Sequence, residues 1–428
     1  MQALLGALSV LLLLALLAAA SFGARRLKLP PEAARKTVHV GLGLYCLTLP
    51  ALFTSAAPVV ATCAAAALLL LGVRAAKARG RGMGLAQGLH GVARQSYGEL
   101  LFAAAVALLF VLGRANPITY ALPLAILALS DAAAALVGQR YGRATFRIED
   151  GTKSWEGAAI FFLTAWIIAM VLLLLLSDAP RLNVILLGAG IAAYGTLVEA
   201  TSWRGWDNFL LPLAVHLLLA HNLDASPLVL LEGAGVSAAV LALLLAAGNR
   251  LRIGRHAAVF VSTVIATVAF ASTTWNVAVP ALALGCYLAV DDAPDGGDDA
   301  PHPHLALGLV FVGLSLGWYV LSDVTGATTI FAFNVSFGAL GVALLAAHGR
   351  PGPALAMVPV VWAVVEARVM LVEETTPTGP AAMAVLLLLL LGSVAVASLA
   401  RRWCRPVACE GLGGLALVAG AFAFPFAQ

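Results

Sequence analysis

Ionisable and polar side chains gather in four short clusters between residues 32 and 212, in a chain that is predominantly apolar. The first cluster follows two consecutive prolines, and its members recur at a spacing of i, i+3, i+4 and i+7: Glu32, Arg35, Lys36 and His39. That spacing places all four on one face of a helix that starts after the prolines. A role as a basic anchor at the membrane surface explains Arg35, Lys36 and Glu32. It does not explain the presence of His39.

The second cluster contains Arg94 and Glu99, and Glu99 opens an apolar run. A carboxylate at this point can complement the positive end of a helix dipole without any further role. It can also accept a proton from a reacting group, as His39 can. The spacing of these residues leaves both interpretations open.

The third cluster is longer and begins inside an apolar run. Asp131 is surrounded there by alanines, whose small side chains let a neighbouring helix or a ligand come close. The glycines that follow give the backbone more conformational freedom. The ammonium of Lys153 and the hydroxyl of Ser154 are suited to holding phosphate. The other members of this cluster are Gly138, Arg140, Gly142, Arg143, Lys153, Ser154 and Glu156.

The fourth cluster joins the end of one apolar run to the start of the next. Glu199 stands near the end of the first run, and Asp207-Asn208 opens the second. Asp207 has an ordinary interpretation as the N-cap of a helix. The pair also offers the oxygen ligands that Mg²⁺ takes in proteins, one or two carboxylates together with substrate phosphate. The sequence therefore predicts a helix cap or a magnesium site here.

The composition determines which elements must position these clusters. Hydrophobic residues make up 62% of the chain and charged residues only 11%, against about a quarter in soluble domains. This excludes a soluble enzyme. A transmembrane helix needs about 20 apolar residues, and about sixteen candidate runs occur along the chain. We expect an all-α fold: a polytopic helical bundle in a lipid bilayer, with about 14–16 transmembrane helices.

The charged residues predict the orientation of this bundle. Lys and Arg number 25 and Asp and Glu number 21, without a basic stripe, so no nucleic-acid partner is expected. Short cytoplasmic loops retain Lys and Arg. With the N-terminus outside, all basic residues except Arg114, Arg181 and Arg368 fall in cytoplasmic loops. All four clusters then lie at the cytoplasmic face of what we expect to be a bacterial-type inner membrane, where one shared polar site explains them together.

Five motifs resemble those of the polyprenol, dolichol and phytol kinase family, membrane enzymes that use CTP to phosphorylate a lipid alcohol. In the family's order they are Glu32-x-x-Arg35-Lys36-x-x-His39, Arg94-x-Ser96-x-Gly98-Glu99, Asp131-Ala-x-Ala-Ala-x-x-Gly138-x-x-Tyr-Gly142, Lys153-Ser-x-Glu156-Gly157 and Glu199-Ala with Asp207-Asn208-x-x-x-Pro212. The related phosphatidate cytidylyltransferases share a region of the Asp131 to Gly157 type. Their Lys-Asp and His-Gly-Gly-x-x-Asp-Arg signature is not present in this sequence.

The resemblance implies phosphoryl transfer from a nucleoside triphosphate to the hydroxyl of an isoprenoid alcohol or of diacylglycerol, with Mg²⁺ as cofactor. CTP as the donor is implied by the resemblance alone. The expected metal ligands are Asp131, Asp207 and Asn208. The candidates for handling the alcohol proton and the reacting groups are Glu99, Glu199, His39 and Asp131. The residues expected to hold the triphosphate are Lys153, Ser154, Glu156, Gly138, Arg140, Gly142, Arg143, Arg35, Lys36 and Arg94.

The resemblance covers about half of the chain. It predicts a kinase-like membrane domain over residues 1–225 and a further membrane-helical domain over residues 226–428, whose role the sequence does not indicate. The alternatives are CDP-lipid synthesis, as in the cytidylyltransferases, a membrane transporter, and a non-catalytic scaffold in a lipid pathway. A transporter would line its path with ionisable residues at mid-membrane depth. The crowding of polar groups at one surface disfavours that alternative.

Overall fold

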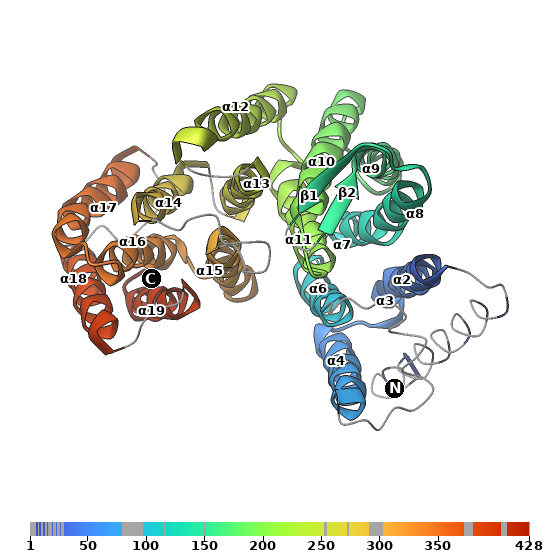
Figure 1. Cartoon of the computed structure of the whole chain (residues 1–428), viewed down its shortest axis with the longest axis horizontal. Coiled ribbons are helices and arrows are strands. Elements are labelled where there is room, and N and C mark those ends of the chain that lie inside the picture. Colours follow the sequence, from blue (N-terminus) through green and yellow to red (C-terminus); the bar gives the residue numbers. More distant parts are fainter. Residues whose placement is uncertain are drawn as a thin grey trace. The chain divides into compact units, whose positions relative to one another are not determined.

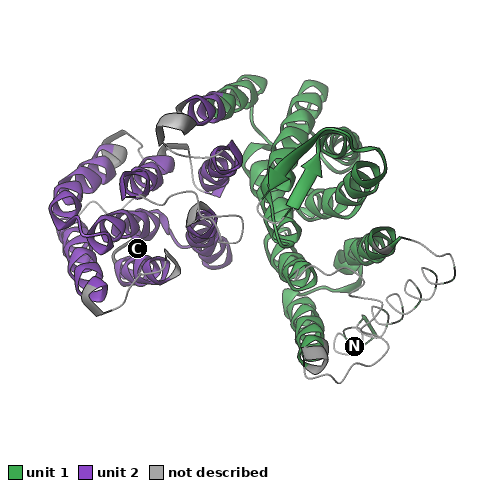
Figure 2. Ribbon diagram, in the orientation of Figure 1, with its two compact units in different colours: residues 1–238 green, residues 239–428 purple. Residues whose placement is uncertain are grey.

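The computed structural model divides the chain into two compact units, residues 1–238 and residues 239–428 (Figure 2). It describes isolated positions before residue 30 and then residues 30–78, 97–114, 116–148, 151–251, 255–271, 274–290, 303–371, 380–403 and 409–427. Each unit is a bundle of helices. The predicted domain boundary near residue 225 stays a prediction.

Figure 1 shows the helices of unit 1. They are α2 (Pro31–Leu47), α3 (Leu49–Leu52), α4 (Ala56–Ala78), α6 (Gly98–Leu112), α7 (Pro117–Ala125), the π-helical turn η1 (Ile126–Ser130), α8 (Asp131–Tyr141), α9 (Trp155–Leu176), α10 (Arg181–Thr201) and α11 (Asp207–Asn222); α12 (Pro227–Leu251) starts in this unit. Helix α2 starts where the two prolines predict it, with a proline in its first turn and Glu32 beside it.

Helices α7 and α8, with η1 between them, form one continuous apolar segment over Pro117–Tyr141. Asn116 caps its start by accepting a hydrogen bond from the Ile118 backbone N–H at 3.3 Å. A π turn widens the helix and occurs frequently at functional sites. Here it ends at Ser130, so that it delivers Asp131 as the first residue of the straight helix that follows.

A short antiparallel hairpin joins α8 to α9 and was not expected from the sequence. Its strands are β1 (Thr145–Ile148) and β2 (Gly151–Ser154), with Phe146 opposite Lys153. Ser154 then caps α9, since its hydroxyl accepts a hydrogen bond from the Gly157 backbone N–H at 3.1 Å. The hairpin thus leads directly from one apolar helix into the next and carries Lys153 between them.

Unit 2 contains the remaining helices: α13 (Arg255–Ala271), η2 (Thr274–Val277), α14 (Ala278–Val290), α15 (Pro303–Thr325), α16 (Ile330–Ala347), α17 (Pro351–Leu371), α18 (Pro380–Trp403), α19 (Cys409–Ala423) and η3 (Phe424–Ala427). Helix α16 is its core element, because every residue from Phe331 to Ala347 is buried. It packs against α14, α17, α18 and α19. A helix that is apolar all round can be buried on every side in this way.

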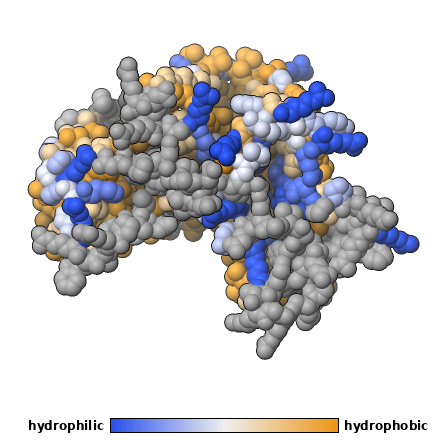
Figure 3. All heavy atoms as spheres, in the orientation of Figure 1, coloured by the Kyte–Doolittle hydropathy of each residue, from blue (hydrophilic) through white to orange (hydrophobic). Residues whose placement is uncertain are grey.

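The all-α polytopic membrane fold is confirmed. In the described parts of the chain, seven helices are long and apolar enough to cross a membrane, and shorter apolar helices accompany them. Large apolar side chains stand exposed on several of these helices, among them Leu68, Leu175 and Leu228. Figure 3 shows wide apolar areas on the visible face, with hydrophilic side chains gathered in patches. Such surfaces suit contact with lipid rather than water. The number of 14–16 spans stays a prediction.

We expect the hairpin to face the cytoplasm, and labelling of engineered cysteines tests this. Thr152 in β2 is exposed, and Asp178 lies beyond the other end of the 22-residue helix α9, which is about 33 Å long. In a background without the five native cysteines, Thr152→Cys should react with an impermeant maleimide only after the cytoplasmic side is opened. Asp178→Cys should react in intact cells. The reverse pattern would invert the proposed orientation.

Candidate active site

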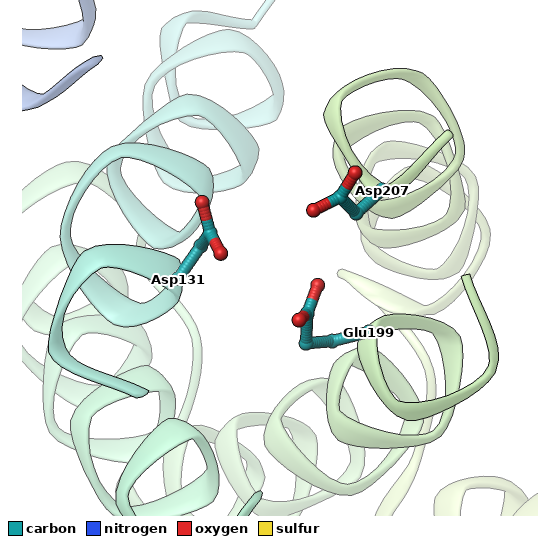
Figure 4. A group of neighbouring side chains, drawn as sticks. All are labelled: Asp131, Glu199 and Asp207. Carbon is teal, nitrogen blue, oxygen red and sulfur yellow. The ribbon is translucent and has the colours of Figure 1, made fainter. Parts of the chain in front are cut away.

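Three carboxylates from three different helices converge in unit 1. Asp131 is the first residue of α8, Glu199 lies in the last turn of α10, and Asp207 is the first residue of α11. One oxygen of each lies within 4.8 Å of the others. Figure 4 shows the three side chains pointing into one space between the helices. We call these three residues the acidic trio.

A tight turn brings Glu199 and Asp207 together. Helix α10 ends when the Ser202 backbone N–H and hydroxyl both bond to the Val198 carbonyl, at 3.0 and 2.7 Å. Arg204 and Gly205 then take positive φ angles of 47° and 87°, a conformation that L-residues rarely adopt. The chain reverses within five residues and starts α11. The interpretation of Asp207 as an N-cap is wrong, because Trp206 holds that position.

The first cluster reaches the acidic trio through α2. The Lys36 side chain is 4% exposed, and its Nζ lies 2.5 Å from Asp131 Oδ2. His39 lies beside it, with Nε2 3.2 Å from the Leu127 carbonyl and 3.5 Å from the same Asp131 oxygen. A carbonyl only accepts, so the contact with Leu127 requires a proton on Nε2. The His39 ring packs edge-on against Phe102, which fixes the imidazole against the π turn that precedes Asp131.

Lys153 reaches the trio from the hairpin. Its Nζ lies 2.7 Å from Glu199 Oε1, and it also donates a hydrogen bond to the Glu199 backbone carbonyl. Burial alone would lower the pKa of the Lys153 ammonium, but the negative charges of Glu199 and Asp207 raise that pKa above its ordinary value. The ammonium therefore stays charged. The second Glu199 oxygen, Oε2, is buried and has no hydrogen-bond partner among the described residues.

Electrostatics explains why two lysines accompany three carboxylates. Two like unit charges about 5 Å apart repel by roughly 3 kcal/mol at an effective dielectric constant of about 20. Three ionised carboxylates would therefore drive the helix ends apart unless cations stand between them. Lys36 and Lys153 each neutralise one carboxylate, on the Asp131 side and on the Glu199 side. One net negative charge remains among these five residues. Together with the carboxylate oxygens, it suits the site to one further cation.

Several other residues of the four clusters have structural partners. Glu156 accepts hydrogen bonds from the backbone N–H groups of Arg143 and Ala144, at 3.0 and 3.2 Å, and so closes the base of the hairpin. A Cβ on Gly138 or Gly142 would lie 2.9 or 2.8 Å from the Ser154 hydroxyl. These two glycines therefore allow α8 to pack against the hairpin. Binding of phosphate by this group stays a prediction.

The other candidates lie outside the trio. Glu99 is paired with Arg74 at 2.5 Å, a partner that the sequence did not single out. Arg35 is paired with Glu32 at 2.6 Å on the exposed side of α2. Asn208 is buried next to Asp207. The Arg140 guanidinium lies over the ring of Tyr141, Arg143 is exposed, and Arg94 falls outside the described residues.

Neither a family model nor a solved structure matches the chain. Comparison with curated proteins finds a phytol kinase from the cyanobacterium Synechocystis, 31% identical over 198 residues that make up 44% of this chain and 78% of that protein. The chain belongs to the phytol kinase family. This confirms, at the level of the family, the resemblance that the five motifs indicated.

Membership of the phytol kinase family also gives the site a chemical context. Kinases transfer phosphoryl groups mainly by positioning them and neutralising their charge. The acidic trio and its two buried lysines supply both signs of charge within one small volume. The sequence predicts Asp131 and Asp207 as metal ligands and Glu199 only as a catalytic residue, whereas the structure places Glu199 beside them as a third possible ligand. No local sequence pattern indicates that grouping.

Proposed function

We propose that the protein is a membrane kinase that transfers the γ-phosphoryl group of CTP to the hydroxyl of an isoprenoid alcohol such as phytol. The alcohol oxygen forms a bond to the γ-phosphorus, the bond from that phosphorus to the β-phosphate oxygen breaks, and CDP leaves with the electron pair. The observation that carries this proposal is the convergence of Asp131, Glu199 and Asp207 beside Lys36 and Lys153.

The donor set fits Mg²⁺. This ion prefers carboxylate oxygens, usually one or two from the protein, and completes its shell with water and substrate phosphate. Asp131 and Asp207 come from different helices and offer that number of carboxylates. When bound, Mg²⁺ would neutralise the charge that develops on the phosphate oxygens. The three groups that converge here are all carboxylates, the ligand type that suits a hard cation.

The remaining groups have separable roles in this proposal. Lys153 stands on the hairpin at the edge of the trio, where its ammonium neutralises the transferring phosphate. Glu199 Oε2, the oxygen without a hydrogen-bond partner among the described residues, accepts the proton of the alcohol. Glu99 is a weaker candidate for that step, because Arg74 occupies its carboxylate. His39 holds the π turn next to Asp131 through Leu127.

A double-label assay tests the reaction. Purified protein receives CTP labelled at either the γ- or the α-phosphorus, with phytol, geranylgeraniol or diacylglycerol as acceptor and phosphatidate in parallel. We expect γ-label in the lipid fraction with the prenols, and α-label only in the aqueous phase. A saturated primary alcohol of similar length is the matched control for the isoprenoid class. Equal amounts of ATP, GTP and UTP test the choice of CTP as donor.

Two outcomes would contradict the proposal. Transfer of α-label to phosphatidate would identify a cytidylyltransferase, because that reaction retains the α-phosphorus in the lipid and releases pyrophosphate. Absence of label from every lipid, with each triphosphate, would favour a transporter or a scaffold.

A further inference from the structure

Lys36 makes an unusual contact for a residue expected to bind phosphate. Its ammonium lies 2.5 Å from Asp131 Oδ2, and both side chains are 4% exposed. The two residues are 95 positions apart in the chain, so this contact joins α2 to the start of α8. A buried ammonium paired with a buried carboxylate opposes the binding of a second cation to that carboxylate, because the two positive charges repel each other at short range.

The two lysines of the site are held differently. Lys153 is bonded both to the Glu199 carboxylate and to its backbone carbonyl, and a carbonyl remains a good acceptor whatever the carboxylate binds. The Lys36 ammonium stands at the end of a flexible four-carbon side chain, and it contacts an oxygen of the Asp131 carboxylate. Arg35, the adjacent cation, is exposed and already paired with Glu32. Lys36 is therefore the cation best able to change partner.

We propose that Lys36 is an internal competitor of the divalent cation: it neutralises Asp131 while the metal is absent, and moves to the triphosphate when the metal binds. This inference rests on the proposed kinase function for the identity of both ligands. The bound metal neutralises the Asp131 carboxylate and repels the Lys36 ammonium, so the ion pair between Lys36 and Asp131 is weakened. The triphosphate then offers the displaced ammonium several anionic oxygens, where a compact, rotatable donor binds well.

Competition has a consequence that simple phosphate binding does not have. Removing the Lys36 charge should strengthen binding of the metal alone, because Asp131 is then free of a competing cation. The same change should weaken binding of the metal-triphosphate complex, because a phosphate partner is lost. A lysine that only binds phosphate would leave the first affinity unchanged. A lysine that only maintains the fold would weaken both.

The test measures Mn²⁺ binding to the detergent-solubilised full chain without nucleotide, from the EPR signal of free Mn²⁺. We expect Lys36→Met to bind Mn²⁺ about tenfold more tightly than the unmodified protein, and its KM for the metal-CTP complex to rise about tenfold. Lys36→Arg retains the positive charge and should not show the tighter Mn²⁺ binding. Arg181→Met removes an exposed charge at the far end of α10 and serves as the matched control.

Loss of the Lys36 charge leaves Asp131 buried without a counter-ion, so Lys36→Met could unfold. Lys36→Gln retains a hydrogen-bond donor without the charge, and the same tighter Mn²⁺ binding is expected from it. Unchanged or weaker Mn²⁺ binding by a folded neutral variant would overturn the competition. Absence of phosphoryl transfer by the unmodified protein would instead overturn the kinase proposal, and the Mn²⁺ affinities would still decide the role of Lys36.

Discussion

Asparagine in place of Asp207 is expected to lower turnover by roughly 10³-fold, because charge stabilisation by a bound metal is worth several kcal/mol in the transition state. Asparagine retains the size and hydrogen bonding of aspartate but removes the charge that holds the cation. The apparent Mg²⁺ requirement should shift upward in the same variant. Turnover measured against Mg²⁺ concentration, with phytol as acceptor, separates this loss of metal from a loss of folded protein.

Asp131→Asn should show the same kinetic loss together with a loss of stability. From the sequence alone, neutralising an aspartate within a span is expected to ease insertion, since an unpaired charge there is costly. The structure reverses that expectation, because Asp131 is the partner of the buried Lys36, and an uncompensated buried lysine costs about 3–5 kcal/mol. Asp178→Asn, at an exposed position beyond α9, is the control and should change neither property. Near-normal kinetics in both the Asp131 and Asp207 variants would exclude the metal role.

Lys153→Ala is expected to reduce phosphoryl transfer by about 100-fold or more, through loss of an ammonium that stays charged throughout the working pH range. Its raised pKa also means that deprotonation of Lys153 does not limit activity as the pH rises toward neutral. Lys153→Arg should be impaired as well, since a planar guanidinium cannot place its charge where a compact ammonium does. Steady-state kinetics with CTP as the varied substrate measures both effects.

The adjacent residue provides the matched control for Lys153. Thr152 is exposed in the same strand, and successive side chains of a strand point to opposite faces. Thr152→Ala should therefore leave kcat and KM within about twofold of the unmodified values. If Lys153→Ala retains normal turnover at saturating CTP and an unchanged KM, the lysine does not contact the triphosphate.

The sequence predicts the helical membrane fold well, because apolar runs of span length are a local property that composition reveals directly. It also predicts that all four polar clusters meet, since the distribution of Lys and Arg places them at one face of the bundle. The structure joins residues of the first, third and fourth clusters in one site. Glu99 of the second cluster instead pairs with Arg74 outside the acidic trio, and Arg94 falls outside the described residues. Helix starts at Pro31 and Pro117 agree with the capping rules for the same local reason.

The sequence could not predict which side chains of the site form ion pairs with each other. The pairing of Lys36 with Asp131 depends on how α2 packs against α8, and the pairing of Lys153 with Glu199 depends on a hairpin that carries no strong strand signal. Motif spacing also does not separate binding residues from structural ones. Glu156 resembles a ligand in the sequence, yet its carboxylate bonds to backbone N–H groups of the hairpin.

Hydrogen bonds hold the two ends of the hairpin together at its base. The Trp155 backbone N–H bonds to the Ala144 carbonyl at 2.9 Å, and Glu156 binds the chain on the opposite side. Residues added beyond Ile148 therefore lengthen the tip without moving Lys153, whereas residues added before Ala144 displace it. An epitope or a fluorescent reporter inserted between the two strands is accordingly expected to leave Lys153 in place.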